Sequence, residues 1–211
     1  VYLLNNAIDL DKFKYDEKIR KEKRKERKIK DDTLVIGHVG RFHFQKNHRF
    51  ILDIFNEILR RKKNVKLLLI GKGELKEQFI EQAEEKGVLQ NIIMLEDRTD
   101  VNELMQAMDV FLFPSLFEGL PVTMVEAQAA GLPCVISDKV PIQCDITGNV
   151  KVVSLEDAPE KWAEVIDDVL KNFKKKDTYE TIVNAGFDIK ENAKWLKDFY
   201  VEALKEAGEN N

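Results

Sequence analysis

The sequence predicts an α/β fold in which helices cover both faces of a parallel sheet. From residue 33 to residue 154, short apolar runs alternate with longer segments of helical periodicity, which is the pattern of βα units. The apolar runs are continuous rather than alternating, as expected for strands that are covered on both faces. With 211 residues, the chain is long enough to bury a full core as one domain.

Six apolar runs are the predicted strands. They are residues 33–40, 65–71, 91–95, 110–114, 133–137 and 150–154. Residues 47–61 place large apolar side chains at helical spacing, which predicts a helix packed on the sheet. Residues 74–87 predict a second crossover helix that ends at Gly87, because glycine commonly follows the last turn of a helix. After residue 155 the pattern is helical throughout.

Residues 1–32 are predicted to be an interdomain connecting segment that includes a charged helix. The apolar start at Val1 breaks on Asn5 and Asn6 as if the chain came from an earlier segment, so we expect a longer protein. Residues 11–31 interleave acids and bases that can pair at i, i+4 along a solvated helix. A second interpretation is that their basic face rests on an anionic membrane surface.

Charge and cysteine usage narrow the class of protein. The formal net charge of -4 argues against a domain built on contacts with nucleic-acid phosphates. Cys134 and Cys144 form no CxxC and have no nearby histidine pair at metal-ligand spacing, so both are predicted to be reduced. No apolar run approaches the length of a membrane span, and the first residues lack the layout of a signal peptide. We therefore expect a cytoplasmic protein that binds no nucleic acid, and contact with the inner face of the membrane stays open.

The loop after the first predicted strand carries two cations. In an open parallel sheet, ligands bind beyond the carboxyl ends of the strands. Gly40 allows close backbone approach there, and Arg41 and Lys46 lie in the loop that leads to the next helix. A guanidinium and an ammonium can together neutralise a diphosphate. The alternative is that both are ordinary solvated loop residues.

A second anion contact is predicted after the fourth strand. Pro121 suits the first turn of a helix and Gly131 suits its end, so a helix is expected over about residues 121–130. The backbone N–H groups of Gly119 and Leu120 then lie at the positive end of the helix, which is a favourable position for an anion. Gly119 also has no side chain to block an approaching phosphate.

Two carboxylates flank this helix start in "FEGLPVTMVEA". Glu118 precedes the helix, where a simple favourable charge would contribute up to about 1 kcal/mol. Glu126 lies in a helix with little polar face, and burying a carboxylate without a partner is unfavourable. The hydroxyl groups of a sugar would satisfy Glu126, because a carboxylate only accepts hydrogen bonds. Sugar and diphosphate together indicate a nucleotide sugar.

Four segments resemble one enzyme family. They are "NNAIDLDKF", "GRFHFQKN", "IGKGELKE" and residues 100–138. Together they are similar to the carboxy-terminal, donor-binding domain of retaining GT-B glycosyltransferases of family 4, also called glycosyl transferases group 1. The spacing of Glu118 and Glu126 matches the E-x7-E element of that family, and the resemblance covers nearly the whole chain.

The resemblance implies a domain organisation. Residues 33–190 would be the Rossmann-like, nucleotide-sugar-binding domain, which is the carboxy-terminal half of a GT-B fold. Residues 191–211 would be an amphipathic C-terminal helix, and the amino-terminal acceptor domain would be absent from this chain. In the family the last helix returns to the partner domain, so the stripe with Trp195 and Tyr200 is expected to be core or interdomain packing.

The resemblance also implies roles for individual residues. Arg41 and Lys46 would hold the donor diphosphate, Glu126 the ribose and Glu118 the transferred sugar, while Arg98 would face the base. The predicted catalytic residues are Arg41, Lys46 and Glu118. The predicted substrate-binding residues are Gly40, Arg98, Gly119, Leu120, Pro121 and Glu126.

The implied reaction moves a hexose, with retention, from a nucleotide-diphosphate sugar to a saccharide or lipid-linked acceptor in capsular or exopolysaccharide synthesis. A UDP-sugar is the favoured donor and a GDP-sugar is the second choice. The sequence has no Asp-x-Asp, and cations with helix N–H groups can stabilise a leaving diphosphate, so no metal or other cofactor is expected. Without the acceptor domain, the chain is expected to bind donor without transferring it. The alternatives are a nucleotide-sugar-binding module and a sugar-nucleotide epimerase of GT-B architecture.

Overall fold

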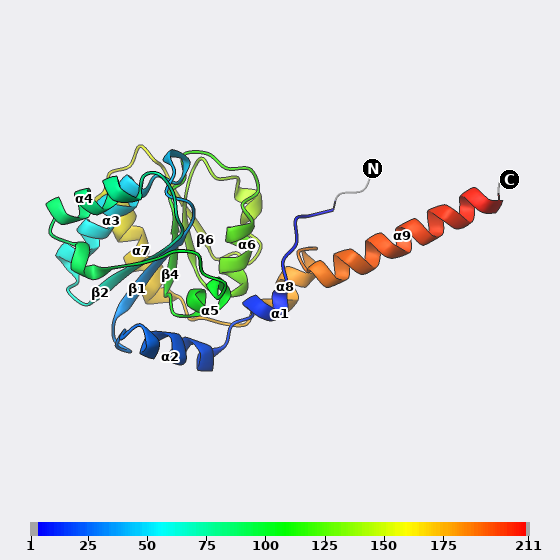
Figure 1. Ribbon diagram of the computed structural model, residues 1–211, viewed down its shortest axis with the longest axis horizontal. Helices are drawn as coiled ribbons and strands as arrows, with labels where there is room; N and C mark the ends of the chain where they lie inside the picture. The colour runs from blue at the N-terminus through cyan, green and yellow to red at the C-terminus, as the bar shows by residue number, and fades with distance from the viewer. Residues whose placement is uncertain (1–3, 210–211) are drawn as a thin grey trace.

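Six parallel strands form the central sheet in the computed structural model, which describes residues 4–209 (Figure 1). The strands are β1 (Leu34–Val39), β2 (Val65–Ile70), β3 (Ile92–Leu95), β4 (Val110–Phe113), β5 (Cys134–Ser137) and β6 (Val150–Val153). Each strand end lies within one residue of the end predicted from its apolar run, so the predicted α/β fold is confirmed. Both faces of the sheet are covered, which explains why the runs are apolar throughout.

The strand order, β3-β2-β1-β4-β5-β6, places the first strand near the middle of the sheet. The chain builds outward from β1 to β3, and then returns to the other side of β1 to add β4. At such a reversal the loops after the two central strands diverge and leave a crevice between them. The carboxyl ends of β1 and β4 are therefore the position where this topology favours a ligand site.

The described residues also form helices, most of which lie around the sheet. In chain order they are α1 (Leu10–Phe13), α2 (Glu17–Glu26), α3 (His48–Arg61), α4 (Lys76–Glu85), α5 (Val101–Gln106), α6 (Val122–Ala129), α7 (Pro159–Asn172), α8 (Tyr179–Asn184) and α9 (Ile189–Glu209). Short 3-10 turns are η1 (Phe44–Lys46), η2 (Leu89–Asn91) and η3 (Ile142–Cys144). The end predicted for the helix before Gly87 is confirmed, because Gly87 follows α4 with a φ of 67° that residues with a side chain rarely adopt.

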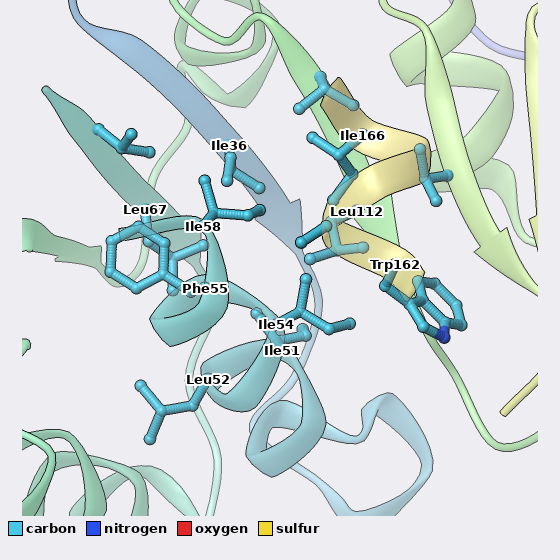
Figure 2. Packing of buried hydrophobic residues seen from close by; sticks show 14 of the residues in the cluster. Ile36, Ile51, Leu52, Ile54, Phe55, Ile58, Leu67, Leu112, Trp162 and Ile166 are labelled. Carbon is cyan, nitrogen blue, oxygen red and sulfur yellow. The ribbon is translucent and has the colours of Figure 1, made fainter. Parts of the chain in front are cut away.

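One face of the sheet packs against α3, α4 and α7. Figure 2 shows side chains of α3 and α7 meeting Ile36 of β1, Leu67 of β2 and Leu112 of β4. The stripe that α3 turns toward the sheet consists of Ile51, Leu52, Ile54, Phe55 and Ile58. All of these side chains are buried, and so is Trp162 of α7, whose indole N–H donates to the Ser154 carbonyl at 3.0 Å.

The other face packs against α5 and α6. The strand residues here are the neighbours of those on the first face, such as Val35, Leu68 and Phe111, because successive residues of a strand point to opposite sides. Met124 and Ala127 of α6 pack on them. This packing fixes where α6 begins, and hence where its N-terminus meets the carboxyl edge of the sheet.

Helix α2 lies against the sheet domain, so the interpretation of a wholly solvated helix is wrong for one of its faces. Arg24 is only 2% exposed, and its guanidinium donates to the Ala107 carbonyl at 3.0 Å and to Asp109 Oδ2 at 3.3 Å. Arg20 donates to Asp109 Oδ1 at 2.6 Å. The exposed face of α2 carries residues of both signs, so its interleaved charges are solvated there as predicted.

The chain segment before α1 pairs with the segment that joins α8 to α9. The Ile8 N–H donates to the Phe187 carbonyl at 3.0 Å, and the Ile189 N–H donates back to the Ile8 carbonyl at 3.0 Å. From this point α9 projects away from the sheet (Figure 1), and Tyr200 and Leu204 on it are exposed, so that stripe is not core of this domain. Interdomain packing of α9 stays a prediction. Within residues 4–209, no helix combines the length and apolarity needed to cross a bilayer.

The predicted connecting segment starts at Val1, and the predicted C-terminal helix ends at Asn211. Residues 1–3 and 210–211 lie outside the described residues. Helix α9 begins two residues before the predicted start at residue 191.

Candidate functional site

The loops after β1 and β4 are joined by hydrogen bonds at the crevice between those strands. Gln45 of η1 donates from its side-chain Nε2 to the Phe117 carbonyl at 2.8 Å. The backbone carbonyl of Gln45 accepts the Leu116 N–H at 2.8 Å. Asn47 donates from Nδ2 to the Pro114 carbonyl at 3.2 Å. The two sequence motifs that were predicted to form one site, from distant parts of the chain, are therefore held side by side.

Lys46 and Glu118 form an ion pair in this crevice. Lys46 Nζ lies 2.6 Å from Glu118 Oε1, and the Glu118 side chain is only 7% exposed. The same ammonium lies 4.7 Å from the centroid of the Phe113 ring at the end of β4. Lys46 is thus pointed into the crevice by a carboxylate and an aromatic face. The sequence predicted both residues in the site but gave no sign that they contact each other.

Arg41 and Gly40 lie at the end of β1 beside this pair. Arg41 is exposed and donates to Glu74 Oε2 at 3.1 Å, so its guanidinium stays available at the surface of the crevice. A Cβ added to Gly40 would lie 3.3 Å from two carbons of the Lys46 side chain and 2.8 Å from His38 Nε2. The predicted close approach at Gly40 is therefore an approach of Lys46 to the backbone.

The N-terminus of α6 opens onto the same edge. The helix begins at Val122, and Pro121 is its N-cap residue with a φ of -76° rather than its first helical residue. No side chain caps this end, and the N–H groups of Gly119 and Leu120 have no acceptor among residues 4–209. Gly119 is exposed, and a Cβ there would meet nothing within 4 Å, so packing within the domain does not require a glycine at this position. Free N–H groups at a helix start form an anion site.

Glu126 lies one turn into α6. Its carboxylate is half-buried, and among the described residues it has neither a hydrogen bond nor an ion pair. Burial raises the pKa of this carboxyl group above its ordinary value. Glu126 is therefore half-buried rather than buried, it lacks a protein partner among the described residues, and hydrogen-bond donors from a ligand would satisfy it.

Arg98 lines a cleft of about 320 Å³ on the other side of the β1 end. The residues around it are Val39, Gly40, Arg41, Ile70, Gly71, Lys72, Asp97, Arg98 and Val101. The Arg98 guanidinium donates two hydrogen bonds to Asp100, from Nε to Oδ1 and from Nη2 to Oδ2, both at 2.8 Å. Such a forked contact fixes the plane of the guanidinium.

A residue of α2 supports Arg98 indirectly. Lys23 Nζ lies 3.0 Å from Asp100 Oδ2 and 2.6 Å from Glu103 Oε2. The Arg98 guanidinium first, and then Lys23, hold the pKa of Asp100 well below its usual range. Sequence reasoning missed Asp100 and Lys23, because nothing in the sequence relates a lysine in a charged run to a carboxylate 77 residues later.

The three histidines are not arranged as ligands. His38 and His48 are buried with their rings 4.9 Å apart, while His43 lies 3.8 Å from Glu74 in the loop after β1. Among the described residues, no group of three histidine, cysteine or acidic side chains is placed to hold a metal ion. Cys134 and Cys144 are both free and buried, as predicted.

The fold and the crevice define a class of protein: a doubly wound α/β domain with cations, free N–H groups and unpaired carboxylate oxygens at its switch point, which suits a nucleotide-type ligand. The sequence model of the glycosyl transferases group 1 matches residues 19–186, and the chain belongs to this family. This agrees with the family resemblance of the motifs.

Known bacterial proteins are similar to the chain. It is 38% identical over 203 residues to the protein EpsF of Bacillus subtilis (strain 168), covering 95% of this chain and 53% of EpsF. It is 32% identical over 136 residues to the capsular polysaccharide biosynthesis glycosyltransferase CapM of Staphylococcus aureus, covering 64% of this chain and 35% of CapM. The chain thus spans about half the length of EpsF.

A solved structure shares the fold. The crystal structure of Anabaena HepE in complex with UDP superposes with a TM-score of 0.79 at 18% identity, over 95% of this chain and 57% of that one. The parallel sheet and its helices are therefore those of GT-B glycosyltransferase structures.

Proposed function

We propose that this chain is the donor-binding half of a retaining glycosyltransferase of family 4. It would take part in moving a hexose from a nucleotide-diphosphate sugar, with UDP as the favoured nucleotide, to a saccharide or lipid-linked acceptor in capsular or exopolysaccharide synthesis. The observation that carries this proposal is the grouping of Arg41, Lys46 and the α6 N-terminus around one crevice. The kinship to CapM and the UDP bound in HepE support it.

In this proposal the cations act on the diphosphate. Arg41 and Lys46 neutralise it, and the N–H groups of Gly119 and Leu120 donate to its oxygens as negative charge grows on the leaving group. Because these donors are already in place, no metal ion is proposed to take part. Glu126 accepts the ribose hydroxyls, Glu118 contacts the transferred sugar, and Arg98 faces the base.

The ion pair between Lys46 and Glu118 adds a consequence. A diphosphate that binds Lys46 competes with Glu118 for the same ammonium, which frees the carboxylate to accept a sugar hydroxyl. Donor binding therefore exchanges one ion pair for two ligand contacts, and the two residues act together.

Two alternatives use the same crevice. A nucleotide-sugar-binding module would bind the donor and have no partner in catalysis, and a sugar-nucleotide epimerase would convert the donor without an acceptor. The length of EpsF, of which this chain covers 53%, favours a transferase with a second domain. Incubating the full-length protein with a UDP-sugar alone distinguishes these alternatives, since only an epimerase changes the sugar.

Calorimetric titration of the chain with UDP, GDP and ADP, with and without a chelator, tests the proposal. We expect one diphosphate to bind without metal, and the double variant Arg41→Ala, Lys46→Ala to bind it at least about 30-fold more weakly, which is about 2 kcal/mol. An unchanged melting temperature is the control for folding. Unaltered affinity in the double variant would show that Arg41 and Lys46 do not bind the diphosphate. If none of the three binds, titrating the full-length protein shows whether the second domain completes the site, and failure there too contradicts the proposal.

Replacing Glu118 and replacing Glu126 are expected to weaken the binding of different ligands. Glu126→Gln is expected to weaken free UDP about tenfold, or about 1.4 kcal/mol, because it loses an acceptor for the ribose hydroxyls. Glu118→Gln is expected to leave UDP binding equal or stronger, since Lys46 is released, and to weaken only the UDP-sugar about tenfold. Titrations of both variants with UDP and the UDP-sugar check this division. Equal losses for both ligands in Glu118→Gln would show that Glu118 does not act on the sugar.

A further inference from the structure

A cavity of about 720 Å³ opens at the amino-terminal edge of the sheet, opposite the crevice. Thr33 and Asn64, which precede β1 and β2, and Asp109, which precedes β4, form its floor. Arg20 of α2 and Lys175, from the segment after α7, form its walls. Its volume is in the range of small-molecule sites, about 300–1,000 Å³. The proposed glycosyltransferase chemistry makes no use of it.

Cations outnumber carboxylates among the residues that line this cavity. Arg20 Nη1 and Lys175 Nζ donate to the same Gln106 carbonyl, at 3.1 and 3.0 Å, so two positive charges lie close together. The carboxylate beside them, Asp109, is shared by Arg20 and Arg24. Among the described residues, Lys175 has no carboxylate in ion-pair contact, and its ammonium lies 5.3 Å over the Tyr15 ring. Lys175 is half-buried, and a cation partly removed from water without a counter-ion is unfavourable.

Residues that line this cavity retain unused hydrogen-bond donors. Lys175 uses one of its three N–H donors, and Arg20 uses three of its five, so each retains two. Asn64 accepts the Thr33 hydroxyl at 2.9 Å, while its amide N–H₂ has no acceptor among the described residues. Several donors and two cations facing one cavity are matched by an oxyanion, which offers acceptors on all sides.

We propose that this cavity binds a small oxyanion of the phosphate class, held between Lys175 and Arg20. The lining also carries the exposed acids Asp31 and Asp32 and the exposed Lys63, so the charge there is mixed. A single phosphate group matches the two cations Lys175 and Arg20, so the ligand is inorganic phosphate or a phosphate monoester. On the rim Lys62 is paired with Asp167 at 2.6 Å and is not needed for the anion.

The protonation of Lys175 makes this binding depend on pH. Burial first, and then the Arg20 guanidinium, lowers the pKa of Lys175 to about 7. The other charged or titratable groups around it are Tyr15, Glu17, Arg24 and Asp109. A bound dianion favours the ammonium form and raises this pKa, so binding takes up a proton. Above about pH 8 the affinity should therefore fall, by up to about tenfold per pH unit.

The test is a titration of the chain with inorganic phosphate at about pH 6, followed by the amide NMR signals of residues 31–34 and 62–64. We expect those signals to move with a dissociation constant of about 1 mM or tighter. Lys175→Met should weaken the binding at least about tenfold, whereas Lys176→Met, at an exposed lysine one residue away, should leave it unchanged. Signals of residues 119 and 120 report phosphate bound at the crevice and keep the two sites apart.

Parallel titrations with glycerol phosphate and glycerol identify the source of the anion. Tighter binding of the ester points to a phosphate monoester, tighter binding of phosphate points to the free ion, and binding of glycerol alone contradicts an anion site. No movement of these amides up to high phosphate concentration would overturn the proposal. So would equal binding by the Lys175→Met and Lys176→Met variants, since an adventitious surface ion would not distinguish the two lysines.

Discussion

Replacing Asp109 by alanine is expected to lower the free energy of unfolding by about 3–5 kcal/mol. Its carboxylate accepts from Arg20 at 2.6 Å, from Arg24 at 3.3 Å and from the Val35 N–H at 2.7 Å. Arg24 is almost fully buried, so alanine leaves its guanidinium without a counter-ion, and it leaves the first strand with an unpaired N–H. Breaking a buried ion pair on one side is costly because the remaining charge cannot return to water.

Denaturant unfolding of four variants, namely Asp109→Ala, Asp16→Ala, Arg24→Met and the double variant Asp109→Ala, Arg24→Met, measures this effect. Asp16→Ala is the matched control: that carboxylate also serves α2, accepting the Lys18 N–H at 2.7 Å, but it is exposed and caps a helix end, so about 1 kcal/mol is expected. Adding Arg24→Met to Asp109→Ala removes the orphaned cation, so the double variant should lose less stability than the sum of the two single variants. A loss in Asp109→Ala no greater than that in Asp16→Ala would show that α2 is not locked by this carboxylate.

The same network shows what the sequence could not indicate. The charged run was predicted as a helix, and α2 is one, because interleaved acids and bases at i, i+4 favour that structure. Which of its cations are buried depends on Asp100, Glu103 and Asp109, whose positions follow only from the packing of α5 and β4 on the sheet. Charge patterning along one segment carries no information about such partners.

The candidate site was predictable to a different degree. Strand ends, the Gly119 loop and the helix after it are local features, and the rule that ligands bind at carboxyl strand ends brings Arg41, Lys46 and Glu118 to one edge. The ion pair between Lys46 and Glu118 requires the exact separation of two loops, which the bonds from Gln45 to the β4 loop set. The cavity beside Lys175 was missed altogether, since its walls come from five separate segments that share no motif.

Acid should destabilise the protein through two buried histidines, by about 2 kcal/mol each between pH 7 and pH 5. His38 is fully buried, and its Nδ1 lies 2.9 Å from the Leu112 carbonyl, while Nε2 has no partner among the described residues. His48 stacks on Phe42 with both ring nitrogens unpartnered among those residues. Burial lowers the pKa of His38 to about 4 and that of His48 to about 2, and the nearby Lys46 ammonium lowers both further.

The direction of the effect follows from these shifts. The folded protein keeps both imidazoles neutral, whereas the unfolded chain protonates them near pH 6.5, so protons bind the unfolded state preferentially. Their stabilising contribution is complete above about pH 7 and declines as the pH falls through 6.5 toward 4. Most carboxylates titrate below this window, and the raised pKa of Glu126 acts in the opposite sense. Lys175, whose pKa is lowered to about 7, adds only a small decline just below pH 7, so most of the decline between pH 7 and 5 reports the histidines.

Measuring the unfolding free energies of His48→Leu and His43→Gln between pH 7 and pH 5 tests whether the buried histidines cause the decline. His48→Leu should be neutral or stabilising at pH 7, because it removes a ring N–H buried without an acceptor, and it should remove about half of the pH dependence. His43→Gln, at a half-buried histidine beside Glu74, is the control for removing a histidine outside the core. If His48→Leu keeps the full slope, His48 is protonated in the folded state. In that case protons reach the folded core. Because His38 lies directly behind Gly40 and Lys46, we would then expect acid to disturb the crevice before it unfolds the domain.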